Sequence, residues 1–378
     1  MRLTLRRVAS TEFVRRDLRV AALPWVVARV LVVATLAMAR FVADKLPELQ
    51  RAHSPSAGLF VYDGGWYRNI ADHGYAALPR EGLRFFPLYP LLGRWLGWVF
   101  FNHTAVALVV ISNGAALLLA AMLHRLVLRE TGDAGIASRA AWFVAVLPAA
   151  LCLVLAYAES LMMVAAVGVF LALRSRRWLP AAALGFAAGF TRPLGLLLIV
   201  PATIEAARVW RGAGGRERAR CVAAVAAPAI GAAAYLAWVG SVFGDPLLPF
   251  SVQSRHDLRG GSVDPVTHVV NSIRDLIHGD RFGAGLHLVW LPVFIAIVVL
   301  IARRLPAAYT AYAAATLLLA MTSSNISSFE RYVFSAFPIV IGVAIATKRD
   351  DANRVIGALA AGGLVAYSLL AFYQLYVP

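Results

Sequence analysis

The chain has few charged residues for its length. Only 15% of its 378 residues are Asp, Glu, Lys or Arg, whereas 60% are hydrophobic and the mean hydropathy is +0.71. Ordinary soluble domains carry about 25% charged residues. This shortage excludes a soluble globule, and the length suffices for about ten spans of ~20 residues and one sizeable loop. The sequence therefore predicts an all-α polytopic integral membrane protein.

Lysine is almost absent. Lys45 and Lys348 are the only lysines among 36 basic residues, so the formal charge of +16 is carried by arginine. Most arginines fall in short runs between apolar segments, where the determinants of membrane topology lie. This distribution favours a role in topology over nucleic-acid binding, and we expect no nucleic-acid partner.

Cysteine and metal-binding patterns are scarce as well. Cys152 and Cys221 are the only cysteines, and both lie inside apolar segments, so no disulfide framework or metal spacing is present. His73, His256 and His268 lack the spacing of metal ligands, and no Walker or dinucleotide motif occurs. The sequence predicts neither a metal site nor a cofactor.

The chain contains eleven apolar runs, each read as one span. The basic clusters between them indicate on which side of the membrane each loop lies. With the N-terminus in the cytoplasm and one crossing per run, every dense arginine cluster falls on the cytoplasmic side, as the positive-inside rule requires. The C-terminus then lies outside. We expect a basic cytoplasmic tail at 1–20 and one multi-pass domain of the plasma (inner) membrane at 21–378, with outer loops at 44–102 and 244–285. The runs are 21–43, 103–128, 138–156, 160–173, 179–190, 193–207, 220–243, 286–302, 306–322, 329–347 and 353–376.

Two of these runs are too short for plain spans. Residues 179–190 and 193–207 cannot cross a ~30 Å core at about 1.5 Å per residue. They meet at Thr191-Arg192-Pro193, which cannot continue a helix. We expect a re-entrant or broken hairpin that brings Arg192 to the outer level of the membrane, because non-helical backbone at that depth must be packed in protein or line a cavity.

The first outer loop holds a candidate catalytic carboxylate, Asp63. It could accept a proton from a substrate hydroxyl, and Gly64-Gly65 beside it would let substrate approach the backbone closely. Asp63 could equally be the N-cap of a helix from about 64 to 73, since Asp is a preferred N-cap. The two roles do not exclude each other.

Other charged residues gather on the same outer face. Arg192 could bind a phosphate with its planar guanidinium or anchor a short helix at the interface. Arg331 is a similar candidate, although Glu330 beside it could neutralise it. Glu159 could be a second acid or a polar turn residue. Asp245 begins the late outer loop.

An aromatic stretch, Phe85-Phe86-Pro87-Leu88-Tyr89-Pro90, closes the first loop. With Trp95 and Trp98 it could form an interfacial aromatic belt. Because Pro87 and Pro90 interrupt a spanning helix, we expect 85–100 to lie along the outer surface, where it could guide a lipid tail.

Two motifs of the first loop resemble the PIG-V-type mannosyltransferases. Residues 62–75, YDGGWYRNIADHGY, resemble the segment W-D-x-x-W-Y-x-x-I-A-x-x-G-Y of that family, and residues 85–90 match its F-F-P-L-Y-P. Weaker motifs follow in the family's order at 157–160, 191–193, 243–246 and 331–332, so the resemblance covers about 20 to 345. The chain departs from the family at Tyr62, where the family has Trp.

The resemblance implies a GT-C fold and a glycosyltransferase that takes a sugar, mannose in this family, from a polyprenyl-phosphate donor on the outer side. It implies that Asp63 is the general base and that a glycolipid or glycan is the acceptor; membrane lipids are further partners. The expected substrate-binding residues are Arg192, Arg331, Trp66, Tyr67, His73, Tyr75, Tyr89, Glu159 and Asp245.

Two other functions fit a polytopic chain with a broken hairpin. A secondary transporter or lipid flippase could use Thr191-Arg192-Pro193 as its binding element, although we find no inverted repeat and few ionisable residues within the runs. A membrane scaffold could use the outer loop as a docking surface.

Overall fold

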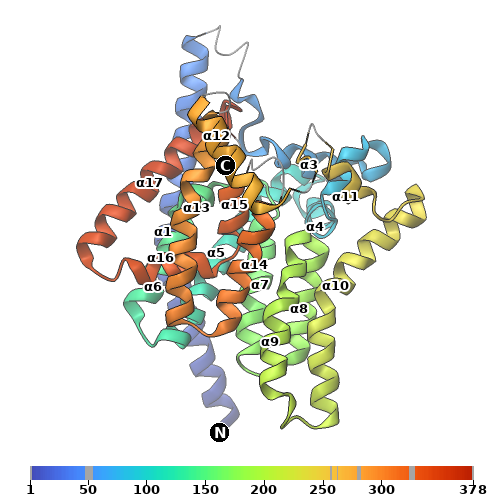
Figure 1. Ribbon diagram of the computed structural model, residues 1–378, viewed down its shortest axis with the longest axis vertical. Coiled ribbons are helices and arrows are strands. Elements are labelled where there is room, and N and C mark those ends of the chain that lie inside the picture. Colours follow the sequence, from blue (N-terminus) through green and yellow to red (C-terminus); the bar gives the residue numbers. More distant parts are fainter. Residues whose placement is uncertain are drawn as a thin grey trace.

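The computed structural model describes residues 2–46, 54–255, 258–261, 263–278, 282–322 and 328–376. Every regular element in these ranges is a helix (Figure 1). The α-helices are α1 (Arg2–Lys45), α3 (Asp63–His73), α4 (Leu88–Gly97), α5 (Thr104–Thr131), α6 (Ala134–Val146), α7 (Glu159–Leu173), α8 (Trp178–Thr191), α9 (Ile199–Trp210), α10 (Gly215–Phe243), α11 (Leu248–Gln253), α12 (Pro265–His278), α13 (Phe282–Arg304), α14 (Ala307–Met321), α15 (Phe329–Phe334), α16 (Pro338–Ala346) and α17 (Asp350–Phe372). The 3-10 helices are η1 (Pro55–Phe60), η2 (Tyr75–Ala77), η3 (Arg80–Arg84), η4 (Trp98–Phe100), η5 (Pro148–Leu153) and η6 (Pro193–Leu198).

Each of the eleven apolar runs coincides with one helix or with two consecutive helices. Within the described ranges, five stretches are long and apolar enough to cross a membrane: Arg15–Lys45, Thr104–Thr131, Pro193–Trp210, Gly215–Phe243 and Asp350–Phe372. Four shorter apolar helices, α6, α7, α8 and α14, pack among them. The prediction of an all-α polytopic membrane protein is confirmed.

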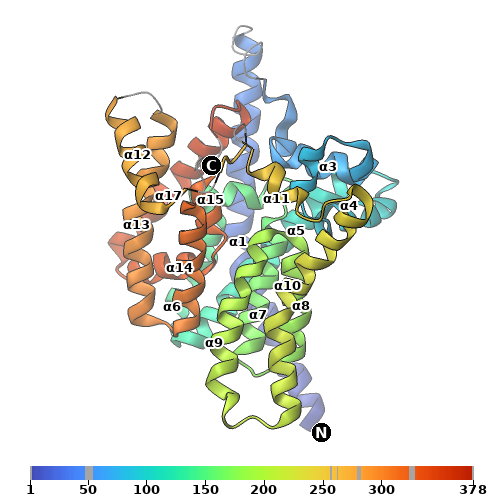
Figure 2. The ribbon, with the colours of Figure 1, turned by 45° about the vertical axis from the view of Figure 1, so that its right-hand side comes forward.

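The loops that carry the arginine clusters meet at one end of the bundle. Arg174 Nε lies 2.9 Å from Glu130 Oε1 and its Nη1 lies 3.5 Å from Glu205 Oε2, which joins the ends of α5 and α7 to α9. Lys348 Nζ lies 4.0 Å from Asp133 Oδ2 at the same end. The N-terminus lies there too, whereas α3, α4, α11 and the C-terminus lie toward the opposite end (Figures 1 and 2). The loops that carry the basic clusters therefore lie at one end of the bundle, as predicted. Which end faces the cytoplasm stays a prediction.

The broken hairpin packs its first helix tightly on α10. A Cβ added at Gly189 of α8 would overlap the Pro228 carbonyl oxygen of α10, and one added at Gly231 would overlap the Phe186 carbonyl oxygen. Gly185 of α8 faces the ring of Pro228. Small residues four apart allow helices in a membrane to approach this closely. The contact fixes α8, whose end carries Arg192.

We predict that Gly189→Ala lowers the free energy of unfolding by about 1–3 kcal/mol, because the added methyl group overpacks the α8–α10 contact. Gly114→Ala in α5 is the matched control, since nothing lies within 4 Å of its added Cβ. That change should stabilise the helix by at most about 1 kcal/mol. Thermal unfolding in detergent measures both variants; equal stabilities would contradict the prediction.

Candidate active site

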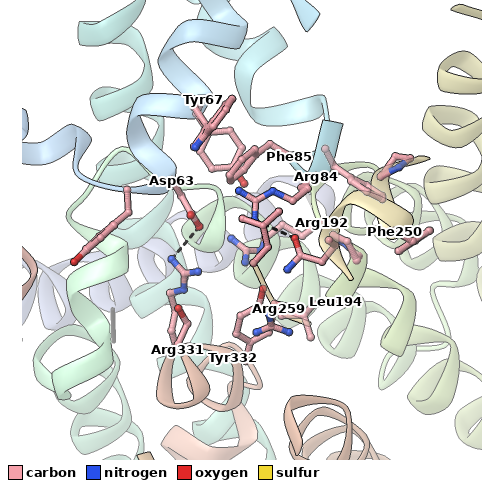
Figure 3. A pocket seen from close by; sticks show the side chains of 18 of the residues that line it. Asp63, Tyr67, Arg84, Phe85, Arg192, Leu194, Phe250, Arg259, Arg331 and Tyr332 are labelled. Atoms are coloured by element: carbon pink, nitrogen blue, oxygen red, sulfur yellow. Dashed lines mark hydrogen bonds and ion pairs between the residues drawn. The ribbon is translucent and has the colours of Figure 1, made fainter. Parts of the chain in front are cut away.

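A cavity of about 620 Å³ lies where the loop between α1 and α5, the end of α8, α11 and α15 meet (Figure 3). Its wall combines aromatic and apolar side chains with several charged groups. The lining residues are Tyr62, Asp63, Trp66, Tyr67, Arg84, Phe85, Phe86, Arg192, Pro193, Leu194, Pro249, Phe250, Gln253, Leu258, Arg259, Leu319, Ser328, Arg331 and Tyr332.

A chain of alternating charges runs along one wall of this cavity. Asp63 Oδ2 lies 2.9 Å from Arg331 Nη1, and Arg331 Nε lies 3.4 Å from Glu159 Oε1. The same oxygen of Glu159 lies 2.5 Å from Arg192 Nη1. The chain therefore joins the first turns of α3 and α7 to α15 and to the end of α8. Three sequence motifs that are distant along the chain meet at Glu159.

The N-terminus of α3 places Asp63 on the wall. Asp63 is the first residue of the helix, and the N-cap is Tyr62, which makes no side-chain cap hydrogen bond. The prediction of Asp63 as the N-cap is therefore wrong by one residue. Tyr62 adopts φ 52° and ψ −116°, a conformation that costs free energy for a residue with a side chain. Such strain directly before a carboxylate is typical of a functional site.

The two glycines after Asp63 serve packing. A Cβ on Gly64 would lie 3.2 Å from the Leu59 carbonyl oxygen, 3.5 Å from the Ala156 carbonyl oxygen and 3.6 Å from the ring of Tyr157. Gly65 faces the Phe60 carbonyl oxygen in the same way, at 3.3 Å. These glycines therefore let α3 sit against its neighbours, while the close approach of substrate to this backbone stays a prediction.

Glu159 is buried and charged, which its position in the sequence did not indicate. It is 0% exposed at the start of α7, so it is no solvated turn residue. Glu330, proposed as the partner of Arg331, turns away from it: its Oε2 lies 2.6 Å from His287 Nδ1, and its Oε1 accepts hydrogen bonds from Tyr376 and Tyr367. Arg331 is paired with Asp63 and Glu159 instead.

Arg192 lies at the break of the hairpin, as predicted. Helix α8 ends at Thr191, Arg192 is extended (φ −156°, ψ 150°), and η6 begins at Pro193. The guanidinium is 7% exposed, and its carbon lies 5.8 Å from the centre of the Tyr332 ring. It is held inside the protein, so it is not an arginine that extends along the surface to the interface.

Two further arginines of the wall, Arg84 and Arg259, were not predicted from the sequence. Arg84 donates to the Glu81 carbonyl oxygen at 3.0 Å and to Gln253 Oε1 at 3.2 Å. The guanidinium carbon of Arg259 lies 3.7 Å from the centre of the Tyr332 ring. Burial and the neighbouring arginines lower the pKa of Arg259, while Tyr332 and Asp63 act in the opposite direction. Neither arginine falls in a recognisable motif, so no signal in the sequence marked it.

The wall also holds two of the predicted aromatic residues. Trp66 stacks on Phe85 with ring centres 5.8 Å apart, and Tyr67 meets the edge of the same ring at 5.1 Å. Both belong to α3 and line the cavity. Burial raises the pKa of Tyr67 well above its ordinary value, because the phenolate would lose its hydration.

Five predicted substrate-binding residues do not line the cavity: Glu159, which lies behind the wall, and His73, Tyr75, Tyr89 and Asp245. His73 is exposed at the far end of α3. The hydroxyl of Tyr75 donates to the Phe85 carbonyl oxygen at 2.6 Å, and that of Tyr89 donates to the Leu108 carbonyl oxygen at 2.8 Å. Asp245 is exposed and accepts from the backbone N–H of Leu247. Tyr75 and Tyr89 pack behind the wall.

No protein-family model and no curated protein matches the sequence. Among solved structures, ArnT from Cupriavidus metallidurans bound to undecaprenyl phosphate is similar with a TM-score of 0.50 at 14% identity, over 92% of this chain and 76% of that chain. The Archaeoglobus fulgidus oligosaccharyltransferase in complex with Zn and sulfate gives 0.45 at 12%, over 94% and 52%. The oligosaccharyltransferase AglB of the same organism, in complex with an inhibitory peptide and a dolichol-phosphate, gives 0.44 at 13%, over 92% and 56%.

The chain spans about half the length of the oligosaccharyltransferases it matches. At identities this low the likeness concerns the fold alone. The likeness to ArnT shows that this membrane protein has a GT-C-type fold, the fold that the two motifs of the first loop implied.

Proposed function

We propose that the protein is a membrane glycosyltransferase that moves a sugar from a polyprenyl-phosphate donor to a hydroxyl group of an acceptor. The proposal rests on one observation: a carboxylate and a surplus of arginines line the same cavity. Arg84, Arg192, Arg259 and Arg331 line it together with Asp63, while Glu159 lies behind the wall and pairs with Arg192 and Arg331. Among the described residues that line the cavity, the arginines therefore outnumber the carboxylates.

This surplus suits the charge that develops during the transfer. A polyprenyl-phosphate sugar is a phosphodiester with one negative charge, and the polyprenyl phosphate that leaves is a monoester with up to two. Fixed positive groups that face a growing negative charge stabilise the transition state more than the bound substrate. Arg192 and Arg331 are buried and both face Glu159, so they are already in place when the charge grows.

Asp63 takes the role of general base in this mechanism. Its Oδ2 is held by Arg331, and Oδ1 accepts the proton of the acceptor hydroxyl. The acceptor oxygen forms its bond to the anomeric carbon as the bond from that carbon to the phosphate oxygen breaks on the opposite face. The configuration at the anomeric carbon is therefore inverted. The stacked rings of Trp66 and Phe85 offer a flat apolar surface for the sugar or the first isoprene units.

Two further observations support the lipid-linked donor. ArnT, whose fold this chain shares, was crystallised with undecaprenyl phosphate. Apolar side chains of η6, α11 and α14 (Leu194, Phe250 and Leu319) line the same cavity as the arginines, which suits a ligand with a charged head and an apolar tail. We assign mannose as the sugar on the resemblance to the PIG-V-type enzymes, and a glycolipid or glycan on the outer side of the plasma membrane as the acceptor.

Asp63→Asn tests the base. Membranes containing the protein are incubated with radiolabelled polyprenyl-phosphate-mannose and endogenous lipid acceptors, and labelled product is measured. We expect turnover to fall by roughly 10²–10⁴, because the amide accepts no proton. Asp72→Asn on the same helix is the control and should retain wild-type turnover, since Asp72 is exposed and pairs with Arg68. Equal turnover in wild type and Asp63→Asn would remove Asp63 from the mechanism.

Arg84→Gln tests the charge surplus. Arg84 donates to two neutral oxygens, the Glu81 carbonyl oxygen and Gln253 Oε1, so its replacement should leave the fold intact. We expect kcat/KM to fall about tenfold, equivalent to about 1.4 kcal/mol of transition-state stabilisation. Arg80→Gln is the matched control, because Arg80 starts the same 3-10 helix and is exposed outside the lining set. A decrease of the same size in both variants would show that the position of the charge does not matter.

A further inference from the structure

Arg29 lies near the middle of a candidate membrane span of α1, away from the candidate site. Its Nε donates to Asn113 Oδ1 at 2.9 Å, its Nη2 donates to the Leu153 carbonyl oxygen at 2.8 Å, and its guanidinium carbon lies 4.8 Å from the centre of the Trp25 ring. These partners are neutral. A charged side chain at such depth is costly and usually marks function.

The backbone that Arg29 holds is irregular and buried. Three successive carbonyl groups, from the last residue of η5 onward, each accept a hydrogen bond from a side chain of another helix. Leu153 accepts from Arg29, Val154 from Asn113 Nδ2 at 3.1 Å, and Leu155 from Ser112 Oγ at 2.7 Å. Backbone groups without helical partners need such donors within a membrane. Arg29, Asn113 and Ser112 therefore fix this stretch, which we name the 153–158 segment.

The same segment supports the candidate site from behind. The backbone N–H of Ala156 donates to the Leu59 carbonyl oxygen at 3.0 Å, and the Tyr157 hydroxyl donates to the Val61 carbonyl oxygen at 3.1 Å. Both bonds hold the turn that precedes Asp63. The guanidinium carbon of Arg331 lies 5.2 Å from the centre of the Tyr157 ring. Glu159, the centre of the charge chain, follows the segment directly.

We infer that Arg29 is a positioning residue for the site: it holds the 153–158 segment, and the segment sets the positions of Asp63, Glu159 and Arg331. The inference rests on the proposed function, because it assigns Arg29 a part in the same reaction. Arg29 acts on the site through the backbone of this segment and through Tyr157, and it does not itself contact the substrate.

The geometry explains why this position holds arginine. Two different nitrogens of one planar guanidinium reach two oxygens on different elements, Asn113 of α5 and Leu153 of η5. A lysine ammonium is a point charge that cannot span both in the same way. A residue that only packed α1 against α5 would be apolar, as Ala28 and Val32 on α1 are.

The chain contains its own reporter for the test. Cys152 directly precedes Leu153 and is 2% exposed, and Cys221 in α10 is 0% exposed. These are the only two cysteines. The rate at which N-ethylmaleimide modifies each thiol in the detergent-solubilised full chain, followed by peptide mass spectrometry, reports local opening at Cys152 and leaves Cys221 as the internal control.

We expect Arg29→Met to speed the modification of Cys152 about tenfold and to leave Cys221 unchanged, and Arg29→Lys to fall between wild type and Arg29→Met. Thr35→Val is the matched control on α1, since the Thr35 hydroxyl donates to the Leu31 carbonyl oxygen of its own helix, and both thiols should react as in wild type. In the transfer assay Arg29→Met should lower kcat about tenfold with the KM for donor unchanged.

An unchanged Cys152 rate in Arg29→Met would overturn the inference. Faster modification of both thiols together with a lower melting temperature would also overturn it, because Arg29 would then stabilise the whole fold and not this segment. The N-ethylmaleimide experiment does not depend on sugar transfer by the protein. Absence of transfer in the wild type would therefore count against the proposed function, while the two thiols would still decide whether Arg29 holds the segment.

Discussion

The buried chain of charges from Asp63 through Arg331 and Glu159 to Arg192 is the constraint on which the site depends. Glu159 is fully buried, so its charge is tolerated only because two guanidinium groups face it. Removing either arginine would leave an uncompensated charge in a medium of low polarity. The ends of α3, α7, α8 and α15 must therefore meet at one place, and this meeting point is also the wall of the cavity.

The periodicity and charge of the sequence predicted the arrangement of helices well. Apolar runs located the helices, and Pro193 located the break that presents Arg192. Asp63, Arg192 and Arg331 were picked out by motif and lie in one cavity. These features are local: a run of apolar residues or a proline acts through its own neighbours in the chain.

What the sequence could not predict depends on contacts between distant segments. Neutralisation of Arg331 by Glu330 was one alternative, but consecutive residues of a helix point in different directions, and these two pair with different helices. His73 was grouped with Asp63 although they are ten residues apart on α3, about 15 Å along its axis. Arg84 and Arg259 reach the cavity from separate loops, and only the folded chain brings them together.

Because lysine is scarce, its two positions can be used to measure the orientation of the molecule in the membrane. Lys45 ends α1 on the side of the candidate site, and Lys348 lies at the other end of the bundle, beside Asp133. Each end thus carries one side-chain amine among the 378 residues. A membrane-impermeant acylating reagent added to intact cells or to inverted vesicles would tag one of these lysines at a time, so that a single tryptic map would assign each end of the molecule to a compartment.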